Sequence, residues 1–363
     1  MTIHLFNPEH DIALASGLSN FTAPHAGRQL RHDLSFLSAI WAQGGDAVLV
    51  DDVEHAERAY HKFAYRLHSL LGNERLYGNR PVFLSWSRPL PAVKVDHINP
   101  WGWNSALKAA LLRHGADSAL LPDDQQLQTI RQLSHRRTAA ALLPKLRTDG
   151  TIGEAFECTT EEQVEALQAQ YGSLVMKAPW SSSGRGLRFV NSKQNLRNST
   201  YLSGWFRNLL ASQGSVMVEP YYNKVKDFGM EFHSDGEGGV NYMGLSLFST
   251  ENGAYTGNIL ATEAVKTQMM SGYLPVGLLE TVRHTICQEL GQVFKGAYTG
   301  LFGIDMMVVA GGEGFLLHPC VEINLRRTMG HVANALAPAD DDLQAVMRIA
   351  YTDNYYKLII NKR

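Results

Sequence analysis

Polar residues interrupt two consecutive apolar runs near the carboxyl end of the chain, and this feature limits the possible folds more than any other. Asp305 lies in the middle of the first run, and Glu322 and Asn324 lie in the second. The turn residues 310–314, Ala-Gly-Gly-Glu-Gly, separate the runs and predict a β-hairpin over 301–325. Carboxylates in buried strands are costly unless they are paired or bind a metal ion. A compensating charge is therefore expected beside this hairpin.

The expected register of the hairpin brings its polar side chains together. Folding about the glycine-rich turn places Asp305 opposite the region of Glu322, and Asn324, two positions further on, shares a face with Glu322. Three hard oxygen ligands would converge there, as Mg²⁺ bound to nucleotide phosphates requires. The alternative is a structural ion pair of Asp305 with Arg326 or Arg327.

A second stretch, VMKAPWSSSGRGLRFV at residues 175–190, has features of a phosphate-binding site. Lys177 ends an apolar run, and a loop rich in serine and glycine follows before a second apolar run. The lysine precedes the glycines, which excludes the G-x-x-x-x-G-K-S/T phosphate loop, and no G-x-G-x-x-G is present. Backbone N–H groups of such a loop can bind phosphate oxygens while Lys177 supplies the countercharge. An exposed hairpin turn is the alternative, because serine and glycine are common in turns.

The amino-terminal part of the chain has the pattern of an α/β unit. Apolar runs at residues 3–6 and 46–50 flank a stretch of helical periodicity over 30–41. The order strand, helix, strand implies a right-handed parallel crossover. Periodicity predicts further helices over residues 104–112 (with Asn104 as N-cap), 124–143, 161–169, 196–210 and 278–294.

In their order along the chain, Lys177, the loop after it, an acidic segment at 219–227 and the D…E-x-N set resemble the ATP-grasp superfamily. The resemblance covers about residues 125–335. It implies that ATP lies between two α+β subdomains that follow a Rossmann-like domain, so the expected fold class is α/β plus α+β. The expected domains are a preATP-grasp-like domain at 1–123, a lid subdomain with the glycine-rich loop at 124–222, and a carboxyl-terminal subdomain with the metal-binding hairpin at 223–363.

The resemblance also implies which residues contact the ATP phosphates. Lys177 matches a strand lysine that contacts these phosphates and takes part in catalysis. The loop after it matches a mobile lid, formed here by Ser181, Ser182, Ser183, Gly184, Arg185 and Gly186. Many members carry an earlier ATP-binding lysine, and in this chain Arg136 stands at the corresponding place, with Lys145 as the alternative. Arginine suits the role because it also binds phosphate.

Matches to the nucleoside, metal and transferred-phosphate sites complete the resemblance. Glu219, Pro220 and Tyr221 resemble the hinge that contacts adenine, and Asp227 matches the acidic residue that binds the ribose hydroxyls. Arg326 matches a catalytic position that often touches the transferred phosphate or acyl phosphate. The implied Mg²⁺ ligands are Asp305, Glu322 and Asn324.

The activity implied by this resemblance is that of a carboxylate–amine ligase. ATP would phosphorylate a small carboxylate, such as that of an amino acid or peptide, and an amine would displace the phosphate from the acyl phosphate. Such chemistry needs positioning and charge neutralisation rather than covalent help from the protein. Two alternatives stay open: a small-molecule kinase on the same scaffold, and a nucleotide-binding protein without turnover, which the missing first lysine suggests.

A polar segment in the amino-terminal unit is a candidate for binding the substrate. Residues 7–11 follow the first expected strand, at the carboxyl end where open α/β sheets place ligands. The nearby His25, Arg28 and Arg31 can bind an anionic or amino-acid-like group. The alternative is a loop whose polar side chains are simply solvated.

Charge, cysteine content and hydropathy limit the partners and the location. The formal net charge is −2, which favours neither nucleic acid nor an anionic membrane as a partner. The three cysteines are odd in number and far apart, as is typical of reduced thiols in a cytoplasmic protein. No apolar run approaches the length of a membrane-spanning helix, and the first residues lack the pattern of a signal peptide. We therefore expect a soluble, cytoplasmic, multi-domain protein that acts on small molecules. A homodimer is compatible with these features.

Overall fold

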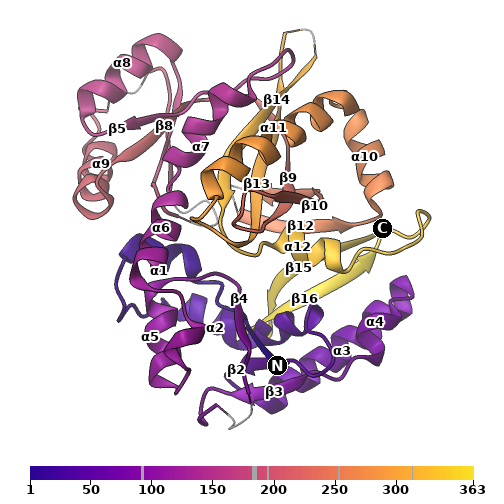
Figure 1. Cartoon of the computed structure of the whole chain (residues 1–363). Coiled ribbons are helices and arrows are strands. Elements are labelled where there is room, and N and C mark those ends of the chain that lie inside the picture. The colour runs from indigo at the N-terminus through magenta and orange to yellow at the C-terminus, as the bar shows by residue number, and fades with distance from the viewer. Residues whose placement is uncertain (91–93, 182–185, 194–195, 252–253, 313) are drawn as a thin grey trace.

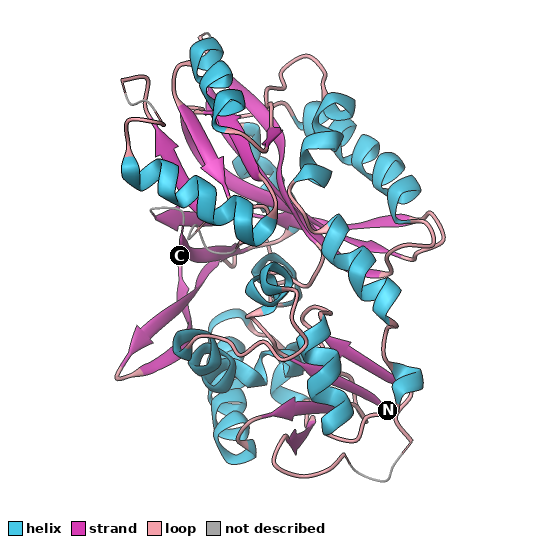
Figure 2. Cartoon of the chain, turned by 90° about the vertical axis from the view of Figure 1, so that its left-hand side faces the viewer, coloured by secondary structure: helices cyan, strands magenta, loops and turns pink. Residues whose placement is uncertain are grey.

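A computed structural model describes residues 1–90, 94–181, 186–193, 196–251, 254–312 and 314–363 of the 363-residue chain. These residues form four sheets of four strands each, with helices packed around them (Figures 1 and 2). Within the described residues, no helix is both long enough and apolar enough to cross a membrane.

The amino-terminal sheet is entirely parallel, as the strand–helix–strand pattern predicts. Its strand order is β3-β2-β1-β4. The strands are β1 (Thr2–Leu5), β2 (Ala47–Val50), β3 (Val82–Ser85) and β4 (His97–Pro100), and the helices are α1 (His10–Ser16), α2 (His25–Leu34), α3 (Val53–Leu71), α4 (Glu74–Gly78) and α5 (Ser105–Arg113). The Asn104 side chain accepts a hydrogen bond from the N–H of Leu107, which confirms it as the N-cap of α5.

The second sheet contains the strand that ends in Lys177. It is antiparallel, with the order β5-β8-β6-β7, and lies at the upper left of Figure 1 with two helices. Its elements are β5 (Phe156–Cys158), α8 (Glu161–Tyr171), β6 (Leu174–Lys177), β7 (Leu187–Val190), α9 (Thr200–Gln213) and β8 (Val216–Pro220). The strand–loop–strand arrangement expected over residues 175–190 is confirmed by the pairing of β6 with β7.

The third sheet contains the predicted metal-binding hairpin. It is antiparallel, with the order β10-β9-β13-β14. Its strands are β9 (Lys224–Ser234), β10 (Val240–Ser246), β13 (Gly300–Ala310) and β14 (Phe315–Asn324), and the neighbouring helices are α6 (Asp124–Leu133), α7 (Arg137–Leu142), α10 (Glu263–Ser271), α11 (Val276–Phe294) and α12 (Met329–Ala335). Asp305 pairs with Glu322 across the hairpin, so the predicted register is correct.

Side-chain alternation gives this third sheet one apolar face and one polar face. Phe228, Met230 and Phe232 of β9 are buried in a core that includes the apolar side of α11. Asp227 and Glu231 occupy the intervening positions and line a cavity on the opposite face. The sheet therefore presents its polar residues to one side because its other side packs against helices.

The fourth sheet was not predicted. Its order is β11-β12-β15-β16 and all its pairs are antiparallel. The strands are β11 (Phe248–Glu251), β12 (Ala254–Leu260), β15 (Ala345–Thr352) and β16 (Tyr355–Lys362). Met347 and Ile360 are buried in the same core as residues of α3, and Figure 1 shows β15 and β16 descending beside the amino-terminal sheet. The last two strands therefore share a hydrophobic core with α3 of the amino-terminal part.

Two predicted helices differ from those observed. The helix expected over 30–41 ends at Leu34, and a 3₁₀ helix continues from Ser35 to Ile40. The helix expected over 124–143 is divided into α6 and α7, because the Ser134 hydroxyl bonds back to the Ile130 carbonyl and ends the first segment. Residues of both segments pack in the core of the third sheet. The proposed domain boundaries at 123/124 and 222/223 stay predictions.

Candidate functional site

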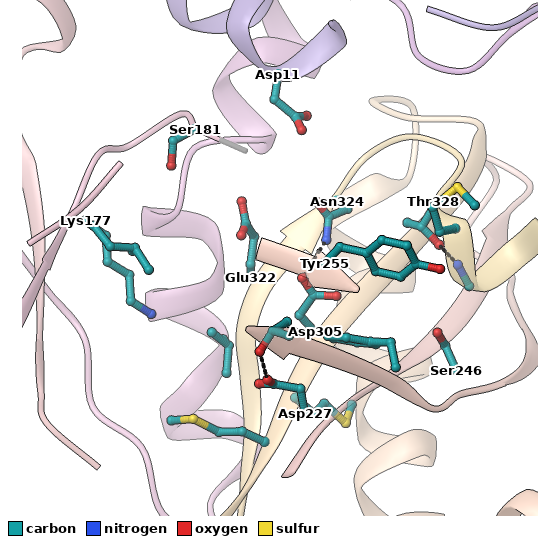
Figure 3. A pocket seen from close by; sticks show the side chains of 18 of the residues that line it. Asp11, Lys177, Ser181, Asp227, Ser246, Tyr255, Asp305, Glu322, Asn324 and Thr328 are labelled. Atoms are coloured by element: carbon teal, nitrogen blue, oxygen red, sulfur yellow. Dashed lines mark hydrogen bonds between the residues drawn. The ribbon is translucent and has the colours of Figure 1, made fainter. Parts of the chain in front are cut away.

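The polar face of the third sheet brings the predicted acidic residues into one group. In the register of the sheet, Asp305 pairs with Gly229 on one side and with Glu322 on the other. Positions two apart on a strand share a face, so Asp227 and Asn324 project to the same side as these residues. Figure 3 shows Asp305, Glu322 and Asn324 together, with Asp227 nearby and Lys177 across the cavity.

These side chains line a cavity of about 500 Å³ between the second and third sheets and the amino-terminal domain. Residues of the second sheet, the third sheet and the amino-terminal domain all line this cavity. The lining includes these predicted site residues: Arg136, Lys177, Ser181, Glu219, Pro220, Tyr221, Asp227, Asp305, Glu322, Asn324 and Arg326. Of the loop residues, Ser182, Ser183, Gly184 and Arg185 lie outside the described residues.

The electrostatics of the acidic group favour a bound cation. Burial, with the neighbouring Glu322 and Glu231 carboxylates, raises the pKa of Asp305 to about 7. Asn324 donates a hydrogen bond from Nδ2 to Asp305 Oδ2 at 3.2 Å. Carboxylate and amide oxygens are the ligand types that Mg²⁺ prefers, so this donor set fits a magnesium ion. The predicted alternative, an ion pair of Asp305 with Arg326 or Arg327, is not formed among the described contacts, since Arg326 bonds to Asp11.

Lys177 is held at the carboxyl end of β6 by a buried ion pair. Its Nζ donates to Glu219 Oε2 at 2.6 Å, and both residues are buried. Glu219 belongs to β8, the neighbour of β6, so the pairing of these strands brings the two side chains together. This contact keeps a positive charge at the cavity wall where phosphates are expected to bind.

Arg136, the predicted counterpart of the first lysine, lies between the second sheet and the acidic group. Its guanidinium donates to the Ala178 carbonyl at 2.6 Å, to Ser181 Oγ at 2.8 Å and to Glu322 Oε2 at 2.6 Å. It therefore connects the start of the predicted lid loop with a predicted metal ligand. Lys145, the alternative, pairs with Glu289 and is more than half exposed.

Arg326 is bound to the amino-terminal domain. Its Nε and Nη2 donate to the two oxygens of Asp11, both at 2.8 Å, and Nη2 also donates to Asn324 Oδ1 at 2.9 Å. Burial alone would raise the pKa of Asp11, but the Arg326 guanidinium outweighs it and holds this pKa below its usual range. Burial conversely disfavours the charged guanidinium, yet Asp11 raises the pKa of Arg326 overall. The pair fixes the guanidinium beside the metal ligands.

The predicted nucleoside-binding residues lie at one end of the cavity. The Asp227 carboxylate accepts hydrogen bonds from Lys224 Nζ at 2.6 Å and from the Thr250 hydroxyl. The N–H of Tyr221 already donates to the Ser173 carbonyl at 2.9 Å, so it is not free to bind adenine in this arrangement. Pro220, at the end of β8, has only a carbonyl to offer.

The amino-terminal substrate candidates divide between two places. Asp11 lines the main cavity. His25 and Arg28 line a separate pocket beside the β15–β16 turn, and Arg31 pairs with Glu9 and Asp51. Most of the candidates near residues 25–31 therefore lie outside the main cavity.

The sequence analysis missed several polar residues of the cavity. These are Glu231, Ser246, Tyr255, Asn258 and Thr328. A signal was present for Glu231, since it is a carboxylate within the apolar strand segment GMEF, the same pattern that singled out Asp305. Tyr255 and Asn258 lie on β12, for which no strand was predicted.

Comparison with solved structures shows the fold. The biotin carboxylase domain of *Hydrogenobacter thermophilus* 2-oxoglutarate carboxylase, solved with MgADP, ADP and bicarbonate, matches with a TM-score of 0.53 at 12% identity, over 97% of this chain and 75% of that one. *Campylobacter jejuni* biotin carboxylase, solved as an ATP complex, matches with a TM-score of 0.50 at 13% identity, over 97% and 76%. The chain has the ATP-grasp fold, preceded by a Rossmann-like domain, as its sequence predicted.

Comparison with curated proteins adds one relative. The chain is 23% identical over 208 residues to a butirosin acyl-carrier protein–L-glutamate ligase of *Niallia circulans*. The match covers 56% of this chain and 45% of that protein, so the chain spans less than half the length of its relative. No protein-family model matches the sequence.

Proposed function

We propose that the protein is an ATP- and Mg²⁺-dependent ligase that joins a small carboxylate to an amine through an acyl phosphate. The observation that carries this proposal is the shared cavity, in which three hard oxygen ligands face two buried cations. Asp305, Glu322 and Asn324 come from the third sheet, Lys177 lies across the cavity from them (Figure 3), and Arg136 is hydrogen-bonded to Glu322. Opposite charges so arranged suit Mg²⁺ and a triphosphate.

Each group has a distinct part in the proposed reaction. Lys177 and Arg136 bind phosphate oxygens of ATP, and Arg326 binds the carboxylate or phosphate oxygens of the reacting group. Asp305, Glu322 and Asn324 hold Mg²⁺, which neutralises charge on the phosphates when bound. The predicted lid beginning at Ser181 excludes water, which would otherwise hydrolyse the acyl phosphate. Asp227 binds the ribose, and Glu219 to Tyr221 form the adenine-side wall.

The compared proteins support this choice of chemistry. The *Hydrogenobacter* structure holds MgADP, and the *Niallia* protein is a ligase for an acyl-carrier protein and L-glutamate. We therefore propose an amino acid or a related small carboxylate as a substrate class. The *Hydrogenobacter* domain is a dimer, which is consistent with a homodimer here. The cytoplasmic location stays a prediction from the sequence.

Release of ADP together with hydroxylamine trapping tests the proposed function. Pooled amino acids, dipeptides and dicarboxylates are supplied with Mg-ATP, and ADP is measured with and without an amine. A ligase forms an acyl phosphate, which hydroxylamine converts into a stable hydroxamate. A kinase instead leaves the phosphoryl group on a hydroxyl product that does not react with hydroxylamine. ATP binding without substrate-stimulated ADP release would show a nucleotide-binding protein, and either of these results would overturn the ligase.

A further inference from the structure

The polar face of the third sheet extends past the metal ligands to a second carboxylate. Along β9, Asp227, Gly229 and Glu231 project to the cavity side, and Gly229 pairs with Asp305. Two residues of an extended strand span about 7 Å. Glu231 therefore lies about 7 Å along β9 from Gly229, the residue opposite Asp305. It lies in the direction away from Asp227, the proposed ribose ligand. The cavity end at Glu231 is thus where a substrate other than the nucleotide would lie.

The Glu231 carboxylate is buried and receives no hydrogen bond from the described part of the chain. Glu231 is 3% exposed, and its Oε2 is buried without a hydrogen-bond donor. His331 Nδ1 lies 2.9 Å from Oε2, but this nitrogen accepts the N–H of Thr328 at 3.1 Å. His331 Nε2 faces the Phe232 carbonyl at 3.3 Å, which places the ring proton on Nε2. In this tautomer Nδ1 carries no proton, so the imidazole donates no hydrogen bond to Glu231.

The cations near Glu231 are engaged elsewhere. Lys266 donates to the Leu245 carbonyl at 2.6 Å and to Asn334 Oδ1 at 2.7 Å, and its ion pair is with Glu263. Arg326, the cation beside the metal ligands, bonds to Asp11. Among the described residues no lysine or arginine pairs with Glu231, and its contact with His331 is an ion pair only when that imidazole is protonated. A buried carboxylate next to a neutral imidazole is costly, and a positively charged ligand would remove that cost.

Two glycines leave space for this carboxylate. A Cβ atom at Gly330 would lie 1.9 Å from Glu231 Oε1, and one at Gly303 would lie 2.5 Å from Oε2. The other polar groups at this end are uncharged: Asn258 donates to Ser246 Oγ at 2.9 Å, and Tyr255 donates to Asn258 Oδ1 at 2.5 Å. Figure 3 shows Ser246, Tyr255 and Thr328 on the far side of Asp305 from Lys177.

We propose that Glu231 binds the ammonium group of the amine co-substrate, a primary amine such as an amino acid. This inference rests on the proposed ligase function and assigns its second substrate to a place in the cavity. A buried carboxylate next to neutral hydroxyl and amide groups is a chemically suitable site for an R–NH₃⁺ group. The position beyond the metal ligands brings that amine beside the carboxylate that ATP activates.

The variant Glu231→Gln tests this assignment while keeping the shape of the side chain. The proteinogenic amino acids are supplied one at a time as amines, and the KM of the most active one is measured by ADP release. We expect this KM to rise at least about tenfold, equivalent to about 1.4 kcal/mol, while the KM for ATP stays the same. Hydroxamate formation should also stay the same, because hydroxylamine needs no ammonium site. Glu54→Gln, a carboxylate change in an exposed ion pair on α3 and outside the cavity, should leave all three measurements unchanged.

Other outcomes show whether the amine site at Glu231 or the proposed ligase function is wrong. An unchanged amine KM with intact hydroxamate formation would overturn the inference alone. Weaker binding of Mg-ATP by Glu231→Gln would show that Glu231 serves the metal, which also overturns the inference. Absence of hydroxamate from the unmodified protein would overturn both proposals. If Glu231→Gln does not fold, Glu231→Asp shifts the charge by one methylene and should raise the amine KM in the same selective way.

Discussion

At the scale of single residues, the ionisation of Asp305 reports on the proposed metal site. Its pKa is raised to about 7, so the native protein without metal holds a proton that the unfolded chain has lost. The contribution of Asp305 to the free energy of unfolding therefore falls as the pH rises from about 4 to about 7. The charged carboxylate then destabilises the native state above this window.

We predict that Asp305→Asn stabilises the metal-free protein at about pH 8 by about 2 kcal/mol, allowing for partial solvent exposure. The gain should vanish at about pH 3, where Asp305 is largely protonated in both the native and the unfolded protein. Urea unfolding in EDTA measures the difference at each pH. Adding Mg²⁺ should stabilise the unmodified protein and leave the variant unchanged. A variant that is less stable than the unmodified protein in EDTA at high pH would contradict this description of the site.

The buried pair of Lys177 and Glu219 gives a second prediction at this scale. Lys177→Met should abolish ATP binding and destabilise the protein by about 3–5 kcal/mol, because it leaves the Glu219 carboxylate buried without a partner. The double variant Lys177→Met/Glu219→Gln removes that charge and should recover most of the stability. ATP binding should stay lost in the double variant, as measured by calorimetric titration. Recovery of ATP binding would exclude Lys177 as a phosphate ligand.

At the scale of elements, the connection between β6 and β7 depends on one close backbone approach. The Gly186 carbonyl accepts from the Ala178 N–H at 2.8 Å, and a Cβ atom at Gly186 would lie 2.5 Å from Ser181 Cβ. We predict that Gly186→Ala displaces Ser181 and raises the KM for ATP by about tenfold, with little effect on the amine KM. Gly204→Ala, on α9 with open space at the Cβ position, is the matched control. Equal effects of the two changes would show that the loop does not contact ATP.

The elements that could be predicted are those with a local sequence pattern. The parallel amino-terminal strands, the β13–β14 register and the N-cap at Asn104 all follow from local periodicity or turn chemistry. The β11–β12 hairpin has a polar sequence because Tyr255 and Asn258 face a cavity, so alternation of polar and apolar residues could not reveal it. The β15–β16 hairpin packs against α3, which lies nearly 300 residues earlier in the sequence. No local sequence pattern indicates such a distant contact.

The predicted site shows the same division between local and distant signals. Asp305 and Glu322 could be paired from the sequence because a short turn joins their strands. The contact of Arg136 with Glu322 joins residues 186 positions apart, and that of Arg326 with Asp11 joins residues 315 positions apart. Such contacts depend on how the domains pack, so no local pattern in the sequence could indicate these partners.

For the molecule as a whole, the Asp11–Arg326 pair joins the amino-terminal domain to the end of the third sheet. Each side chain is 16% exposed, and the contact is bidentate. We predict that Asp11→Asn lowers the free energy of unfolding by about 2–4 kcal/mol, since it leaves the guanidinium without its carboxylate. Urea unfolding measures the loss, and Glu54→Gln, in an exposed ion pair on α3, should cause little change. Equal stability of both variants would show that the pair does not hold the domains together.

We propose that one cavity binds Mg-ATP through Asp305, Glu322 and their neighbours. Calorimetric titration with the non-hydrolysable analogue AMP-PNP, with and without Mg²⁺, tests it most directly on the unmodified protein and on Asp305→Asn/Glu322→Gln. We expect the unmodified protein to bind the analogue in a Mg²⁺-dependent way. The folded double variant should bind it at least about 100-fold more weakly, equivalent to about 2.7 kcal/mol. Equal, Mg²⁺-dependent affinity of the two proteins would contradict it.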